Sequence, residues 1–125
     1  MRHSIRLHTV TIGHSDLEHV DIEVRRAWGA FRPALGYDLV QPVFQLYSRA
    51  VDRDGVTKDA ALLERYYKSR DALNLQLVDA DGRPIGTSAI HIADFSDAGG
   101  GIELDVLIND DTYWQRRIRH KPTAV

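Results

Sequence analysis

The chain of 125 residues contains no cysteine, and this absence excludes several classes of chemistry at once. Without thiols there are no disulfides, thiolate nucleophiles, cysteine-ligated zinc sites or iron–sulfur clusters. No apolar run comes near the roughly 20 residues that a membrane-spanning helix needs. Residues 1–6 are polar and no apolar segment follows them, so we expect no secretory signal. The sequence therefore predicts a cytoplasmic protein that does not enter a membrane.

An excess of charge of one sign is also missing. The 16 basic and 18 acidic residues give a formal net charge of −2, which leaves no basic surplus for nucleic acid or anionic lipid. Aromatic residues make up only 8% of the chain and are scattered, so no stacking surface for RNA is predicted. Length and composition are those of one globular domain. We expect this domain to cover residues 1–115 and a basic tail over 116–125 to fray.

The N-terminal part of the chain predicts a strand followed by a helix. Residues 4–12 alternate between the two faces of a strand. Ser15 and Glu18 then have the spacing of a helix capping box. Apolar residues follow at intervals of three and four, which predicts a helix over 15–31 with Trp28 in its buried stripe.

The middle of the chain predicts a second strand and a second helix. Residues 38–51 alternate in polarity, and Pro42 places the start of this strand at a sheet edge. A helix capped by Thr57 or Asp59 is expected to run to about Asp71.

The C-terminal half predicts a meander of strands. Residues 73–78 and 85–95 alternate around an Asp81-Gly82 turn, which is typical of a hairpin whose glycine has a positive φ. Residues 102–108 predict a further strand, and a short helix is expected through Ile118. The resulting order, β-α-β-α-β-β-β with a short C-terminal helix, predicts an α+β fold. We expect a mostly antiparallel sheet with the helices packed on one face.

The sequence contains neither a phosphate-binding loop for a cofactor nor the motif of a serine nucleophile. The run of three glycines at 99–101 lacks the following lysine and helix of a phosphate-binding loop. Ser88 lies within a predicted strand, not at the sharp strand-to-helix turn of a serine nucleophile. We therefore expect no cofactor and no bound metal.

Histidine and aspartate supply the candidate catalytic residues. His8 and His91 both lie in predicted strands and have apolar neighbours, and Asp94 follows at the end of the second strand. If the two strands pair, these side chains can meet in one pocket, where a histidine near its ordinary pKa serves as an acid or a base. Gly13, His14 and Ser15 form a weaker candidate, an anion site at the N-terminus of the predicted first helix.

The C-terminal helix supplies candidate interface residues, since Tyr113, Trp114 and Ile118 lie on a helix too short to be stable alone. The leading hypothesis is a non-catalytic interaction or assembly module that forms a homo-oligomer, with an unknown protein or small molecule as a further partner. The alternative is a small enzyme or ligand-binding domain with its pocket around His8, His91 and Asp94.

Overall fold

The computed structural model describes residues 2–119 and shows an α+β fold built on two antiparallel sheets. The first sheet has the strand order β5-β2-β1-β6-β7 and the second β3-β4-β9-β8. The strands of the first sheet are β1 (His3–Leu7), β2 (Val10–Ser15), β5 (Arg32–Pro33), β6 (Gln76–Val78) and β7 (Pro84–Ile85). Those of the second are β3 (His19–Asp21), β4 (Arg26–Ala30), β8 (Thr87–Asp94) and β9 (Ile102–Ile108).

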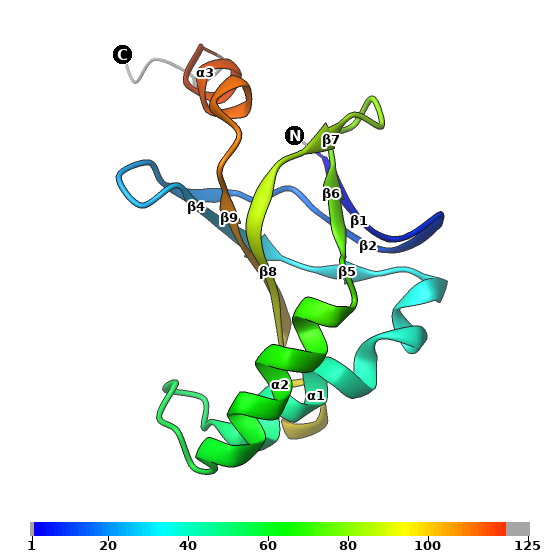
Figure 1. Ribbon diagram of the computed structural model, residues 1–125, viewed down its shortest axis with the longest axis vertical. Coiled ribbons are helices and arrows are strands. Elements are labelled where there is room, and N and C mark those ends of the chain that lie inside the picture. The colour runs from blue at the N-terminus through cyan, green and yellow to red at the C-terminus, as the bar shows by residue number, and fades with distance from the viewer. Residues whose placement is uncertain (1, 120–125) are drawn as a thin grey trace.

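Helices lie at both ends of the two sheets. The pair α1 (Gln41–Ala50) and α2 (Ala60–Ala72) lies side by side at one end, whereas α3 (Asp111–Arg119) lies at the other (Figure 1). Two short 3₁₀ turns, η1 (Leu35–Leu39) and η2 (Ser96–Ala98), precede α1 and follow β8. The helix pair packs against β8, the edge strand of the second sheet, and so stands beside the outer face of that sheet.

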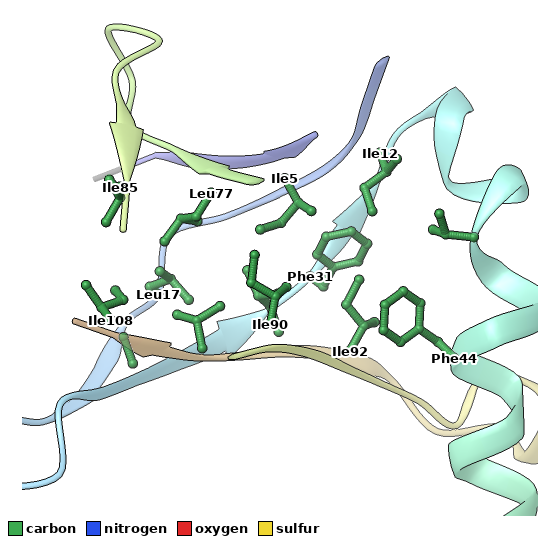
Figure 2. Packing of buried hydrophobic residues seen from close by; sticks show 14 of the residues in the cluster. Ile5, Ile12, Leu17, Phe31, Phe44, Leu77, Ile85, Ile90, Ile92 and Ile108 are labelled. Atoms are coloured by element: carbon green, nitrogen blue, oxygen red, sulfur yellow. The ribbon is translucent and has the colours of Figure 1, made fainter. Parts of the chain in front are cut away.

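The hydrophobic core lies between the two sheets (Figure 2). Ile5 and Leu77 reach into it from the first sheet, and Ile92 and Leu104 from the second, all with no exposed surface. Alternate residues of β4, β8 and β9 fill this core, so the residues between them face outward and form the outer surface of the second sheet.

The predicted α+β class, the short C-terminal helix and the Asp81-Gly82 turn are confirmed. Gly82 has a φ of +80° and links β6 to β7, which pair antiparallel. The single strand predicted over 85–95 is wrong, because β7 ends at Ile85 and β8 belongs to the second sheet. The helical segment α3 includes residues 116–119 of the predicted tail, and residues 120–125 lie outside the described part of the chain.

The helix predicted over 15–31 is wrong, because this segment forms β3 and β4. Ser15 is the buried end of β2, and its hydroxyl accepts a hydrogen bond from the Leu17 amide in place of a helix cap. Trp28 lies half-buried on the outer face of the second sheet and does not belong to the core cluster. β-branched residues between 20 and 24 disfavour a helix, and the strand pairing with β9 decides the outcome.

The strand predicted over 38–51 is also wrong, because most of this segment is α1. Pro42 lies in the first turn of that helix. Backbone N–H groups there have no acceptor within the helix, so a proline, which lacks this group, costs no hydrogen bond. Phe44 and Ala50 are both fully buried, Phe44 in the core cluster between the sheets. The alternation of polarity along the segment does not correspond to a strand.

Candidate functional site

A row of four side chains crosses the whole outer face of the second sheet. His19 of β3 pairs with Trp28 of β4, Trp28 with Asp105 of β9, and Asp105 with His91 of β8. Directly paired residues on one face of an antiparallel sheet hold their Cβ atoms about 4.5–5.5 Å apart. The strand register therefore assembles two imidazoles, an indole and a carboxylate from distant parts of the chain.

Arg26 binds two members of this row. Its guanidinium donates to both carboxylate oxygens of Asp105, at 2.6 Å from Nη2 and 2.9 and 3.0 Å from Nε. The same guanidinium lies 4.3 Å from the centre of the Trp28 ring, and His19 stacks on that ring at 5.5 Å. The hydrogen bond to Asp105 raises the pKa of Arg26 against the opposing effect of burial. Arg26 thus neutralises Asp105 and stiffens the centre of the row.

The helix pair contributes two tyrosines at the other end of the row. The Tyr66 hydroxyl of α2 lies 2.5 Å from His91 Nδ1, and Tyr66 itself is fully buried. The Tyr47 ring of α1 meets the imidazole edge-on, with ring centres 4.3 Å apart and planes at 65°. Burial raises the pKa of Tyr66, so its hydroxyl keeps its proton while it shares a hydrogen bond with His91.

His91 is consequently a neutral imidazole at pH 7. Burial lowers its pKa to about 4, although the nearby Asp105 charge acts in the opposite direction. The hydrogen bond with Tyr66 occupies Nδ1 and leaves Nε2 as the ring nitrogen that can meet a ligand. An imidazole with so low a pKa is too weak a base for efficient proton abstraction near neutral pH.

Two adjoining pockets lie over the row. The larger has a volume of about 660 Å³ and the smaller about 320 Å³, and Arg26, Tyr47, His91 and Asp105 line both. The wall of the larger pocket includes Asp52, Arg53 and Gly55 from the loop between α1 and α2, Phe95 after β8, and the carboxylates Glu18 and Glu103. The smaller pocket continues toward Tyr67 and Arg70 of α2.

The structure does not bring the three sequence-predicted catalytic candidates together. The condition for their meeting, a pairing of the strands of His8 and His91, is not met, since β1 pairs with β2 and β6 whereas β8 pairs with β9. His8 follows β1 in an exposed turn with φ +54°. Asp94 is 2% exposed and lies on the core side of β8, the face opposite His91. Of the three, His91 alone lines a pocket among those described above.

The proposed anion site loses its physical basis, because no helix follows Gly13, His14 and Ser15. Gly13 and His14 lie within β2 and pair with β1 on one side and β5 on the other. The Nδ1 atom of His14 lies 2.9 Å from the Ser4 hydroxyl, and burial, with the charges of Arg2 and Arg32, lowers its pKa. A neutral imidazole at this place adds no attraction for an anion.

The candidate interface residues divide into two groups. Tyr113 and Trp114 are 3% and 4% exposed and dock α3 onto its own chain, where the Trp114 indole donates to the Ile108 carbonyl at 2.8 Å. The Asp110 carboxylate caps α3 by accepting from the Tyr113 amide. Ile118 is 52% exposed and faces away from this contact.

Sequence reasoning identified His91 and missed the other members of the site. The sequence pattern predicts Trp28 in a core helix and indicates no functional role for Tyr47, Tyr66 or Asp105. The usable signal was the alternation of residues 102–108, which places Glu103, Asp105 and Leu107 on one exposed face of the strand. The partners across that face follow only from the strand order.

The chain matches no known family model, and none of the curated proteins or solved structures matches it. No group of three or more His, Asp or Glu side chains within residues 2–119 is placed to hold a metal ion. None of the helices in the same range is long and apolar enough to span a membrane.

The neutral state of His91 predicts acid sensitivity. Its folded pKa of about 4 lies below the ordinary value of 6.5, so between these values the unfolded chain binds a proton that the folded chain does not. Stability is therefore lost as the pH falls from about 6.5 to 4, by about 1–3 kcal/mol for a half-buried group. Thermal melts of the protein and of His91→Asn, which keeps an acceptor for Tyr66, measure this difference. Parallel pH profiles of the two proteins would contradict the burial of a neutral imidazole.

Proposed function

We propose that this domain binds a small polar ligand in the larger pocket, against His19, Asp105 and His91 of the row. The observation that carries the proposal is the convergence of these three side chains with Arg26 and Tyr47 in one hollow of about 660 Å³. Pockets for small molecules have volumes of about 300–1,000 Å³ and combine aromatic walls with a few fixed polar groups. A titratable residue with a displaced pKa inside such a pocket adds weight to the assignment.

Binding is favoured over covalent catalysis by the chemistry of the lining residues. The described residues that line the larger pocket include no serine, threonine or lysine, and cysteine is absent from the chain. His91 is hydrogen-bonded to Tyr66 through Nδ1, which leaves only Nε2 to meet a ligand. Asp105 is committed to Arg26. These groups orient a ligand by hydrogen bonds and ring contacts without forming a bond to it.

Amide chemical shifts test the proposal. A library of small charged and neutral compounds is expected to include members that shift the amides of residues 26–28, 89–93 and 103–107 together. Tyr47→Ala removes one wall of the pocket and is expected to weaken such binding by about tenfold, the scale of a lost aromatic contact. Thr9→Ala, in the turn between β1 and β2, is the matched control and should bind as the unaltered protein does. A library that leaves these amides unmoved would refute the proposal.

Self-association is a second candidate, and one exposed apolar surface favours it. Leu35 is 98% exposed and Leu39 62% exposed on η1, and Gly36 between them lies against the 39%-exposed Val10. This surface does not include Tyr113, Trp114 or Ile118 of α3, the interface residues that the sequence predicts. Light scattering at micromolar concentration, with Leu35→Ser as the variant, tests this candidate. A monomeric mass for the unaltered chain would exclude self-association.

A further inference from the structure

The lining of the larger pocket has an excess of negative charge. It contains four carboxylates, from Glu18, Asp52, Glu103 and Asp105, and two guanidiniums, from Arg26 and Arg53. Arg26 and Asp105 form a two-point ion pair and cancel each other. Arg53, which donates to the Ala98 carbonyl, is the other guanidinium of the lining, and Glu103 also acts on Arg26, so four carboxylates face two guanidiniums in total. The local field therefore favours a positively charged ligand.

The three carboxylates other than Asp105 retain capacity to accept hydrogen bonds. Glu18 uses Oε2 to accept from the Ala30 amide at 3.2 Å, which leaves Oε1 without a protein donor in the described chain. Asp52 accepts from the amides of Asp54 and Val56, both through Oδ1 at 2.9 Å. The side chain of Glu103 is exposed and makes no hydrogen bond or close ion pair with residues 2–119, although its charge acts on Arg26.

Two of the carboxylates stand at the same end of the pocket. Glu103 is the strand partner of Ala30, and Ala30 donates its amide to Glu18. The absence of a side chain at Gly29 makes this arrangement possible, since a Cβ there would lie 2.0 Å from Glu18 Oε2. Both carboxylates therefore line the pocket next to Ala30.

Aromatic rings form the wall next to these carboxylates. Tyr47 meets Phe95 with ring centres 6.3 Å apart and planes at 73°, and meets His91 at 4.3 Å and 65°. Rings at steep angles to one another form a corner that accepts an apolar body or the face of a cation. His91 is neutral at pH 7 and so does not repel a cation from this corner.

We propose that the ligand of this pocket is an organic ammonium ion with an apolar body. The ammonium lies toward Glu18 and Glu103, and the apolar body contacts the corner formed by Tyr47, Phe95 and His91. This inference rests on the proposed function, because it names the class of ligand for the same pocket. A bare metal ion fits less well, since no three ligating side chains in residues 2–119 converge on one point.

Matched pairs of small molecules test the sign of the charge. Choline is compared with 3,3-dimethyl-1-butanol, its uncharged isostere, and 2-phenylethylamine with 2-phenylethanol and phenylacetate. Binding is measured by titration of the amide shifts of residues 26–28, 89–93 and 103–107. Both cations are expected to bind at least about tenfold more tightly than their neutral and anionic counterparts, a scale typical of combined ion pairing and cation–π contact.

Charge-neutralising variants test the position of the ammonium. Glu103→Gln is expected to weaken the binding of both cations by about threefold to tenfold while leaving the neutral compounds unchanged. Asp81→Asn, which removes an equal charge in the β6–β7 turn, is the matched control and should alter neither. Thermal melts check that both variants fold, which their exposed positions favour.

The possible failures have different meanings. Shifts of the pocket amides by the neutral compounds or by phenylacetate, at equal or higher affinity than the cations, would overturn the ammonium assignment and leave the pocket as a binding site. Equal weakening by Glu103→Gln and Asp81→Asn would also overturn it, because a general change in net charge would then explain the effect. The absence of pocket shifts with every compound would overturn both this inference and the proposed function.

Discussion

Replacing Asp94 by alanine is expected to lower the free energy of unfolding by about 3–5 kcal/mol, because four neutral donor groups lose their acceptor, each at a cost of about 1–3 kcal/mol where it stays buried. The Asp94 side chain is almost fully buried, and both of its oxygens accept hydrogen bonds. Oδ2 accepts from the Tyr37 hydroxyl at 2.7 Å and from Gln41 at 3.2 Å. Oδ1 accepts from the Ser96 amide at 3.0 Å and from its hydroxyl at 2.5 Å.

The size of the effect follows from what the carboxylate connects. Tyr37 belongs to η1, Gln41 begins α1 and Ser96 begins η2, so Asp94 joins the end of β8 to the entrance of the helix pair. Burial raises the pKa of Asp94, but the hydrogen bonds from Ser96, Tyr37 and Gln41 outweigh it and lower the pKa overall. The charged form therefore stabilises the fold above the ordinary pKa of 3.8, and this contribution is lost as the pH falls through the lower folded value.

Urea denaturation at pH 7 measures the loss, and Asp97→Ala is its matched control. Asp97 lies three residues further on and accepts a single exposed hydrogen bond from Gln45. Its removal is expected to change the unfolding free energy by less than about 1 kcal/mol. A loss below this value for Asp94→Ala would show that water replaces the carboxylate, which contradicts the buried network.

The elements that could be predicted from sequence are those specified by local chemistry. The hairpin around Gly82 needs only a residue that tolerates a positive φ between two alternating strands. Asp59 caps α2 by accepting from the Leu62 amide, and Asp110 caps α3 in the same way. Each of these signals lies within a few residues of the structure that it determines, so it can be interpreted without knowledge of the fold.

The wrong predictions for residues 15–31 and 38–51 come from sequence patterns that fit both a helix and a strand. The apolar spacing before Phe31 fits one helix face, but the same residues form two short strands once β9 pairs with β4. Pro42 is compatible both with an edge strand and with the first turn of a helix, and the fold uses the helix. Local preference was nearly balanced in both segments, and tertiary pairing determined the result.

The candidate site could not be predicted because its members meet only through strand order. His19 and Asp105 are far apart in sequence, and no local feature shows that β3, β4, β9 and β8 lie in that order. Tyr47 joins the site because α1 packs on β8, and α1 itself was predicted as a strand. His91 was recognisable as a polar residue in an apolar strand, but its partners were not.

Replacing Gly13 by alanine is expected to destabilise the fold by about 2–3 kcal/mol, through overpacking of the core. A Cβ at Gly13 would lie 2.1 Å from Cζ of Phe31 and 2.6 and 2.7 Å from its two Cε atoms. Phe31 is 5% exposed and held by Tyr37, whose ring centre lies 5.4 Å away. The ring therefore has little room to move, and β2 must shift away from β1 or β5 instead.

A double-mutant cycle with Phe31→Leu separates this clash from a general effect on the strand. Leucine lacks the ring atoms that Cβ would meet, so Gly13→Ala should cost less in the Phe31→Leu background than in the original protein. Gly101→Ala is the control for adding a methyl group alone, since a Cβ there has nothing within 4 Å. Unfolding free energies from urea denaturation give the comparison. Additive losses in the cycle would place the cause in the backbone of β2, and the close packing of Phe31 over Gly13 would then not explain the requirement for glycine.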